Sequence, residues 1–145
     1  MFSAWENSIE KLSKLQHRFI KVAQQIDESN TNRPGVCGSW SPKEVVAHII
    51  GWDKEVIRQF GLFQDGLEKA IEHDIDEFNR KSVKERSHLS WEETLAELQQ
   101  AHEQFYQQAK SISSKELSKN EEYKDWVEVQ IDHYKHHTKQ LEKWV

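Results

Sequence analysis

Three Ser-x-x-Glu patterns constrain the fold of this chain more than any other feature of its sequence. They begin at Ser3, Ser41 and Ser90, and each precedes a segment whose apolar residues recur every three or four positions. In such a capping box, the serine and glutamate side chains satisfy backbone N–H groups that would otherwise lack a partner. Pro42 occupies the first helical position of the second segment, where proline is favoured. The patterns therefore predict three long amphipathic helices that begin at these serines.

The apolar spacing along the whole chain predicts four long helices and one short helix. The long helices are expected over about residues 3–28, 41–64, 90–112 and 125–145, and the short one near 74–79. With only five Gly and two Pro in 145 residues, few positions can interrupt a helix. The predicted architecture is one all-α domain over residues 1–145, a four-helix bundle. The long connection between its second and third helices permits a crossover.

Charge and composition exclude several classes of protein. The formal net charge is −5 and the basic residues are interleaved with acidic ones, which disfavours nucleic-acid binding because phosphate neutralisation needs clustered Lys and Arg. No stretch approaches the roughly 20 apolar residues of a membrane-spanning helix, and the N-terminus lacks the features of a signal peptide. The single cysteine, Cys37, cannot form an intrachain disulfide. These features predict a cytoplasmic protein with no membrane partner.

Two histidines in the last predicted helix, His133 and His137, are the strongest candidates for a functional site. Residues four apart share one face of a helix, and here that face carries the apolar stripe. A buried polar group without a partner costs roughly 1–3 kcal/mol, so both imidazoles need partners. His48, at the edge of the apolar arc of the second helix, could complete a three-histidine site for Zn²⁺, Ni²⁺, Fe²⁺ or Mn²⁺. The alternative is a pair of partly exposed histidines that bond to neighbouring residues.

Glu44 and Gln130 are weaker candidates for catalysis. Glu44 lies one turn before His48 and could accept a hydrogen bond from an imidazole or act as a general base, but it also fits the capping box. Gln130 lies beside His133 on the apolar stripe, where it could orient that ligand or contact a substrate. A buried amide that bonds to the backbone is an equally good interpretation of Gln130.

Other polar and aromatic residues have simpler interpretations. Trp40 and Trp52 could line a pocket, although most tryptophans at such spacing belong to the core. Cys37 is interpreted as an ordinary loop cysteine. The remaining histidines are expected on the surface, namely His17, His73, His88, His102 and His136.

Two segments resemble signatures of the DinB/YfiT-like superfamily. The first is the start of the second helix, residues 40–53, which reads WSPKEVVAHIIGWD. It has the Trp, the capping Ser, the acidic residue, Ala-His and an aromatic residue in the order of that superfamily. The second is residues 133–141, HYKHHTKQL, which resembles the last-helix motif: a His-x3-His pair containing a further His, then Gln and an aliphatic residue. Residues 75–79, IDEFN, resemble the ClbS/DfsB branch.

The resemblance implies a four-helix bundle that holds a divalent metal ion with His48, His133 and His137. It implies a metal-dependent enzyme that acts on a small molecule, either by hydrolysis or by transfer of a low-molecular-weight thiol in detoxification. Many relatives have Gly where this chain has Lys139, which changes the rim of the site but removes no ligand.

Two alternatives belong to other classes of protein. The likeness to ClbS/DfsB suggests a non-catalytic protein that binds or sequesters a reactive toxin and does not need the metal. A homodimer could form through exposed aromatic side chains such as Trp5 or Trp144, and it would be compatible with an enzyme.

Overall fold

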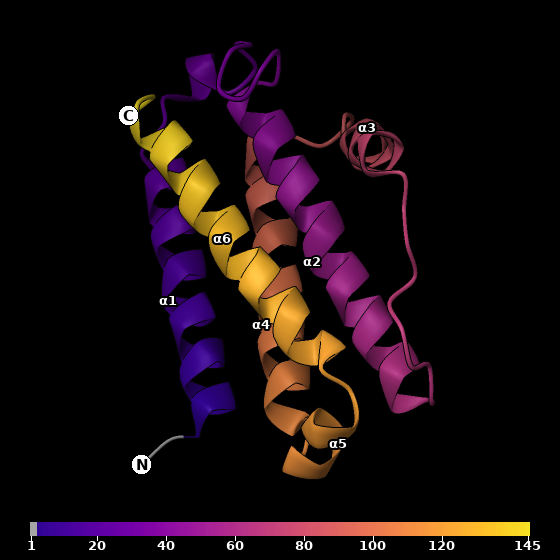
Figure 1. Cartoon of the computed structure of the whole chain (residues 1–145). Coiled ribbons are helices and arrows are strands. Elements are labelled where there is room, and N and C mark those ends of the chain that lie inside the picture. Colours follow the sequence, from indigo (N-terminus) through magenta and orange to yellow (C-terminus); the bar gives the residue numbers. More distant parts are fainter. Residues whose placement is uncertain (1–2) are drawn as a thin grey trace.

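The computed structural model describes residues 3–145 and consists of helices joined by loops (Figure 1). Four long helices form a bundle, which confirms the predicted all-α class. The elements are α1 (Ala4–Gln24), the short 3-10 helix η1 (Glu28–Asn30), α2 (Pro42–Gln64), α3 (Ile75–Glu85), α4 (Trp91–Ser111), α5 (Ser114–Lys119) and α6 (Glu122–Glu142). Within the described residues, no helix is long and apolar enough to span a membrane.

The connection between α2 and α4 is a crossover that returns the chain to the end of the bundle where α2 began. In Figure 1, α1 and α6 run upward while α2 and α4 both run downward. The segment 65–74 rises along the outside of α2 to α3, which lies near the upper end of the bundle and is seen almost along its axis in Figure 1, and this connection makes the parallel arrangement possible. The Gln59 amide holds that segment by pairing with the backbone N–H and C=O of Ile71, both at 2.9 Å. As a result, α2 lies antiparallel to α6, the helix with the histidine pair.

The predicted helix starts agree with the structure because they depend on local hydrogen bonds. The hydroxyls of Ser3, Ser41 and Ser90 each accept from the backbone N–H three residues later. At Ser41 and Ser90 the glutamate side chain also accepts from the serine N–H, which completes both capping boxes.

Three predicted boundaries differ from the structure. The first helix ends at Gln24 rather than near residue 28, because the Asp27 carboxylate accepts from the N–H of Ser29 and starts a 3-10 turn. Asp74 caps an α3 that extends to Glu85, well beyond the short helix expected. Ser113 caps α5 inside the supposed polar linker, and α6 then begins at Glu122.

Aromatic side chains fill the centre of the bundle. Phe60 of α2 packs against Phe105 of α4 and Tyr123 of α6, with ring centroids 5.7 and 5.0 Å apart. Trp5 belongs to this core, since it is 8% exposed and its indole N–H donates to the carbonyl of Ala109 at 3.0 Å. The expectation that Trp5 is exposed was therefore wrong. The homodimer itself stays a prediction.

Gly51 allows α3 to pack closely against α2. A Cβ atom at this position would lie 2.2 Å from Ser82 Oγ and 2.6 Å from Ser82 Cβ. Overpacking costs about 1–3 kcal/mol, and a contact this close belongs to the upper part of that range, so the helix-propensity gain of about 1 kcal/mol offsets only part of the cost. We therefore expect Gly51→Ala to lower the free energy of unfolding in urea by about 1–2 kcal/mol. Gly61→Ala is the matched control in α2, with no atom within 4 Å of the added Cβ. It should raise stability by about 0.5–1 kcal/mol, and an equal gain at Gly51 would contradict the close contact.

Candidate metal centre and adjoining pocket

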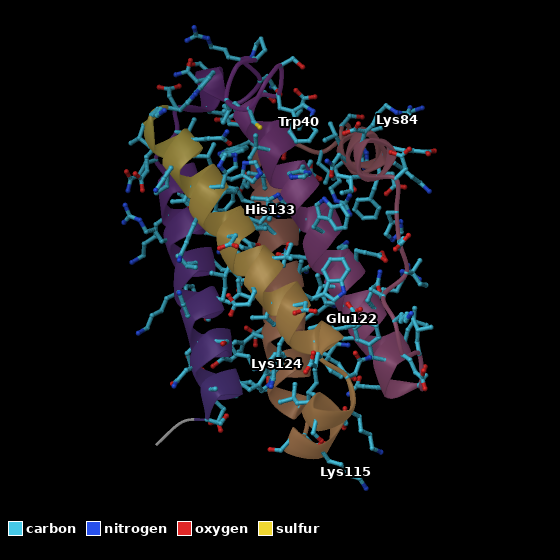
Figure 2. All side chains as sticks on the ribbon, in the orientation of Figure 1. Trp40, Lys84, Lys115, Glu122, Lys124 and His133 are labelled. Carbon is cyan, nitrogen blue, oxygen red and sulfur yellow. The ribbon has the colours of Figure 1, made fainter. Side chains whose placement is uncertain are left out.

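Three histidines from two antiparallel helices meet in the upper half of the bundle. His48 of α2 and His133 and His137 of α6 each offer a ligand nitrogen within 4.8 Å of the others. The Nε2 atoms of His48 and His133 are 2.6 Å apart. His48 and His137 are only 5% and 3% exposed. Figure 2 labels His133 on α6, beside α2. The structure thus brings together the three residues that the sequence singled out.

Two glutamines orient the histidines of α6. Gln130 Oε1 lies 3.4 Å from the Nδ1 atom of His133, and Gln140 Oε1 lies 2.7 Å from that of His137. A neutral imidazole that donates from Nδ1 presents the Nε2 lone pair as its acceptor or ligand. His48 Nδ1 is buried and has no hydrogen-bond partner among the described residues. The arrangement therefore leaves the Nε2 atoms facing one another.

The electrostatic environment keeps these imidazoles neutral. Burial, with the neighbouring His137, lowers the pKa of His48 to about 4. Burial, with the adjacent imidazoles, lowers the pKa of His133 to about 3, and burial also lowers the pKa of His137. Imidazole must be deprotonated to bind a metal, so the set is ready to do so at neutral pH. Three neutral nitrogen donors suit a divalent ion such as Zn²⁺, Ni²⁺ or Fe²⁺, and the residues present therefore fit the implied group.

A second possible cluster shares His137 with the first. Cys37 and the exposed His136 offer ligand atoms within 4.8 Å of each other and of a ligand atom of His137. If His137 donates its Nδ1–H to Gln140 Oε1, only its Nε2 atom is available as a ligand, and the two clusters compete for that atom. The metal assignment therefore requires variants that distinguish them.

A buried carboxylate that was not predicted from the sequence, Asp53, is linked to His133 through Gln130. Asp53 of α2 is fully buried and accepts from Gln130 Nε2 at 2.6 Å and from the Tyr134 hydroxyl. The Nε2 atom of His102, on α4, is 3.3 Å from Asp53 Oδ2. Burial and the Asp53 carboxylate raise the pKa of Tyr134 well above its usual value, so Tyr134 remains a donor. Gln130 thus links Asp53 to His133, and its amide does not use the backbone partner considered earlier.

Several sequence-based assignments change with this geometry. His102 was expected on the surface but is 7% exposed and contacts Asp53 and Tyr134. His73 is half-buried and lies 2.8 Å from the Glu55 carboxylate. The Glu44 carboxylate accepts from the Ser41 N–H at 3.1 Å, which is the capping interaction. A polar residue in an otherwise apolar stripe, as at Asp53, is the sequence signal that could have found the buried network.

A cavity of about 770 Å³ adjoins the histidines between α2 and α6. Trp40, Trp52 and Trp126 line it together with the three histidines. The Trp40 ring lies 4.7 Å from that of His48, and the Trp52 ring 6.1 Å from that of Trp126. Asn79 of α3 holds Trp52 by accepting from its indole N–H at 2.7 Å. Trp40 and Trp52 therefore form pocket walls, one of the two roles that the sequence permitted.

Comparison with known proteins places the chain in a family. The model of the DinB superfamily matches residues 11–141, and the chain belongs to that superfamily. A search of curated proteins found no match.

Three solved structures with the same fold illustrate how far the sequences have diverged. A protein from Streptococcus pneumoniae is 17% identical with a TM-score of 0.83, over 99% of this chain and 91% of the other. The colibactin self-resistance protein ClbS, solved with double-stranded DNA, is 18% identical with a TM-score of 0.79, over 99% and 96%. DfsB, described as a sibling lethal factor precursor, is 13% identical with a TM-score of 0.82, over 99% and 96%. At these identities the likeness concerns the fold alone.

Proposed function

We propose that this protein is a metal-dependent enzyme that acts on a small organic molecule. The observation that carries the proposal is the convergence of three neutral imidazoles at the wall of a 770 Å³ cavity. A divalent ion held by His48, His133 and His137 would supply Lewis-acid chemistry suited to hydrolysis or to activation of a thiol. The location that we propose is the cytoplasm.

The chain's own residues have distinct tasks in this proposal. Gln130 Oε1 and Gln140 Oε1 accept from the Nδ1–H groups of His133 and His137, which would leave the Nε2 lone pairs of both imidazoles free to hold an ion. Trp40 and Trp52 bind the apolar part of the substrate and reduce its contact with water. The buried position of the histidines lowers the local polarity, which strengthens electrostatic interactions with a reacting group.

Elemental analysis of untagged, natively purified protein tests the proposal most directly. An affinity column could load nickel artificially, so no tag is used. We expect about one divalent ion per chain, and we expect turnover of ester or amide substrates, or of a thiol with an electrophile, to stop when a chelator removes the ion. Protein that contains no ion and takes none up from Zn²⁺, Ni²⁺, Mn²⁺ or anaerobic Fe²⁺ would refute the proposal.

A protein that protects by binding, without catalysis, is the second candidate. The cavity supports it, since its aromatic walls do not depend on a metal ion. The fold shared with ClbS, which is named as a self-resistance protein, favours the same role. A variant in which His48, His133 and His137 are all alanine separates the two candidates. If cells that produce this metal-free variant still resist a reactive toxin, binding without catalysis is favoured. If their resistance is lost, catalysis is favoured. Binding of the same variant to double-stranded DNA, which is present in the ClbS structure, can also be measured.

A further inference from the structure

The side chains around the cavity that carry a full charge are all negative. Besides its histidines, the cavity is lined by three ionisable acids, Glu122, Asp125 and Asp132, all on α6. Over the part of the chain that the structure describes, no Lys or Arg lines it, and none of these carboxylates takes part in an ion pair. Such a rim attracts cations and repels anions.

The aromatic walls of the cavity also favour a positively charged ligand. Trp52 is stacked near Phe78 and Trp126, with ring centroids 4.2 and 6.1 Å away. Tryptophan faces attract ammonium groups through their quadrupole. The buried indole N–H of Trp126, which also lines the cavity, has no hydrogen-bond partner among residues 3–145. An acceptor atom on the uncharged body of a ligand would satisfy this donor, so it points to a bound ligand but not to the sign of the ligand's charge.

The charges are separated along the axis of α6. Asp125 and Glu122 precede His133 by eight and eleven residues, which corresponds to about 12 and 16 Å along a helix that rises 1.5 Å per residue. In Figure 2 the labelled side chains of Trp40, His133 and Glu122 follow one another down the same side of the bundle. The three histidines thus lie toward one end of the aromatic cavity, and Glu122 and Asp125 lie toward its other end.

We propose that the cavity binds an elongated organic cation with an aromatic or apolar body. Its positive group lies near Glu122 and Asp125, its body lies along Trp52 and Trp126, and its reactive group reaches the histidines. The last part rests on the proposed function, whereas the charge preference does not. Anionic groups at the end of the cavity near Glu122 and Asp125 meet carboxylates and no Lys or Arg among the described lining residues, so they are disfavoured at that end.

Three probes of equal length test the charge preference on metal-free protein. They are a naphthylalkyl ammonium, the corresponding alcohol and the corresponding carboxylate, with binding followed by calorimetry. We expect the ammonium to bind about 3- to 10-fold more tightly than the alcohol, as cation–π contacts and a partly screened charge pair allow. The carboxylate should bind most weakly. Equal affinities for the ammonium and the alcohol, or tightest binding of the carboxylate, would overturn the proposal.

A pair of double variants locates the charge effect. Glu122→Gln with Asp125→Asn should remove most of the preference for ammonium over alcohol while leaving the affinity for the alcohol within about twofold. Glu92→Gln with Glu128→Gln is the matched control, since both residues are exposed, one lies in a first helical turn, and neither lines the cavity. The control should keep the preference of the parent protein, and an equal loss in both double variants would contradict the proposed position of the cation.

The proposal of a metal-dependent enzyme and the proposal of a cationic ligand can be refuted independently of each other by these experiments. If the ammonium preference is present but no preparation takes up a metal, the proposed function fails and the ligand class stands. If one metal binds per chain but the probes show no preference, the ligand class fails and the metal site stands.

Discussion

Replacing His133 by alanine is expected to weaken binding of a divalent metal by more than about 100-fold. Loss of a residue that only supports a ligand already costs about 10–100-fold, and His133 is proposed as a ligand itself. The side chain is half-buried and its removal leaves the α6 backbone intact, so the helical circular dichroism should hardly change. Titration with Zn²⁺ against a chromophoric chelator measures the affinity.

His136→Ala is the control that distinguishes the two clusters sharing His137. His136 belongs only to the cluster with Cys37, whereas His133 belongs only to the cluster with His48. We expect His136→Ala to bind metal as the parent protein does. Loss of the metal in His136→Ala with retention in His133→Ala would move the site to the cysteine cluster and contradict the three-histidine assignment.

Asp53→Ala is expected to cause the largest loss of stability, about 2–5 kcal/mol, because two buried donors each lose an acceptor. The fully buried carboxylate accepts from Gln130 and Tyr134 and lies near His102, so its removal leaves buried donors on two further helices without an acceptor. Equilibrium unfolding in urea, performed on metal-free protein, measures the loss. Asp53→Asn keeps the volume and one acceptor oxygen and should lose less.

Asp132→Ala provides the matched control for a carboxylate without buried partners. Asp132 is exposed on α6 beside His133, and the change should alter stability by less than about 0.5 kcal/mol. A loss below about 1 kcal/mol for Asp53→Ala would mean that the buried network contributes little and that packing alone joins α2, α4 and α6.

Local hydrogen bonds explain which parts of this fold were predictable from the sequence. The helix starts at Ser3, Ser41 and Ser90 depend on residues three positions apart, and so does the shared face of His133 and His137. Two boundary errors also had local causes, since the 3-10 turn capped by Asp27 and the short helix α5 capped by Ser113 depend on neighbouring residues that the sequence shows.

The amino-acid sequence by itself determined the four long helices, their apolar faces and the histidines that share those faces, because each depends on neighbours within about one turn. Only the tertiary structure decided that α2 and α4 run parallel. The resemblance to the DinB/YfiT-like signatures already implied that His48 joins His133 and His137, and the structure supplied the distance between His48 and His133, which are 85 residues apart. The hydrogen bond between Gln130 and Asp53, 77 residues apart, was not predicted. No local pattern encodes such pairs, because helices can pack in several orders and the crossover through α3 selects one of them.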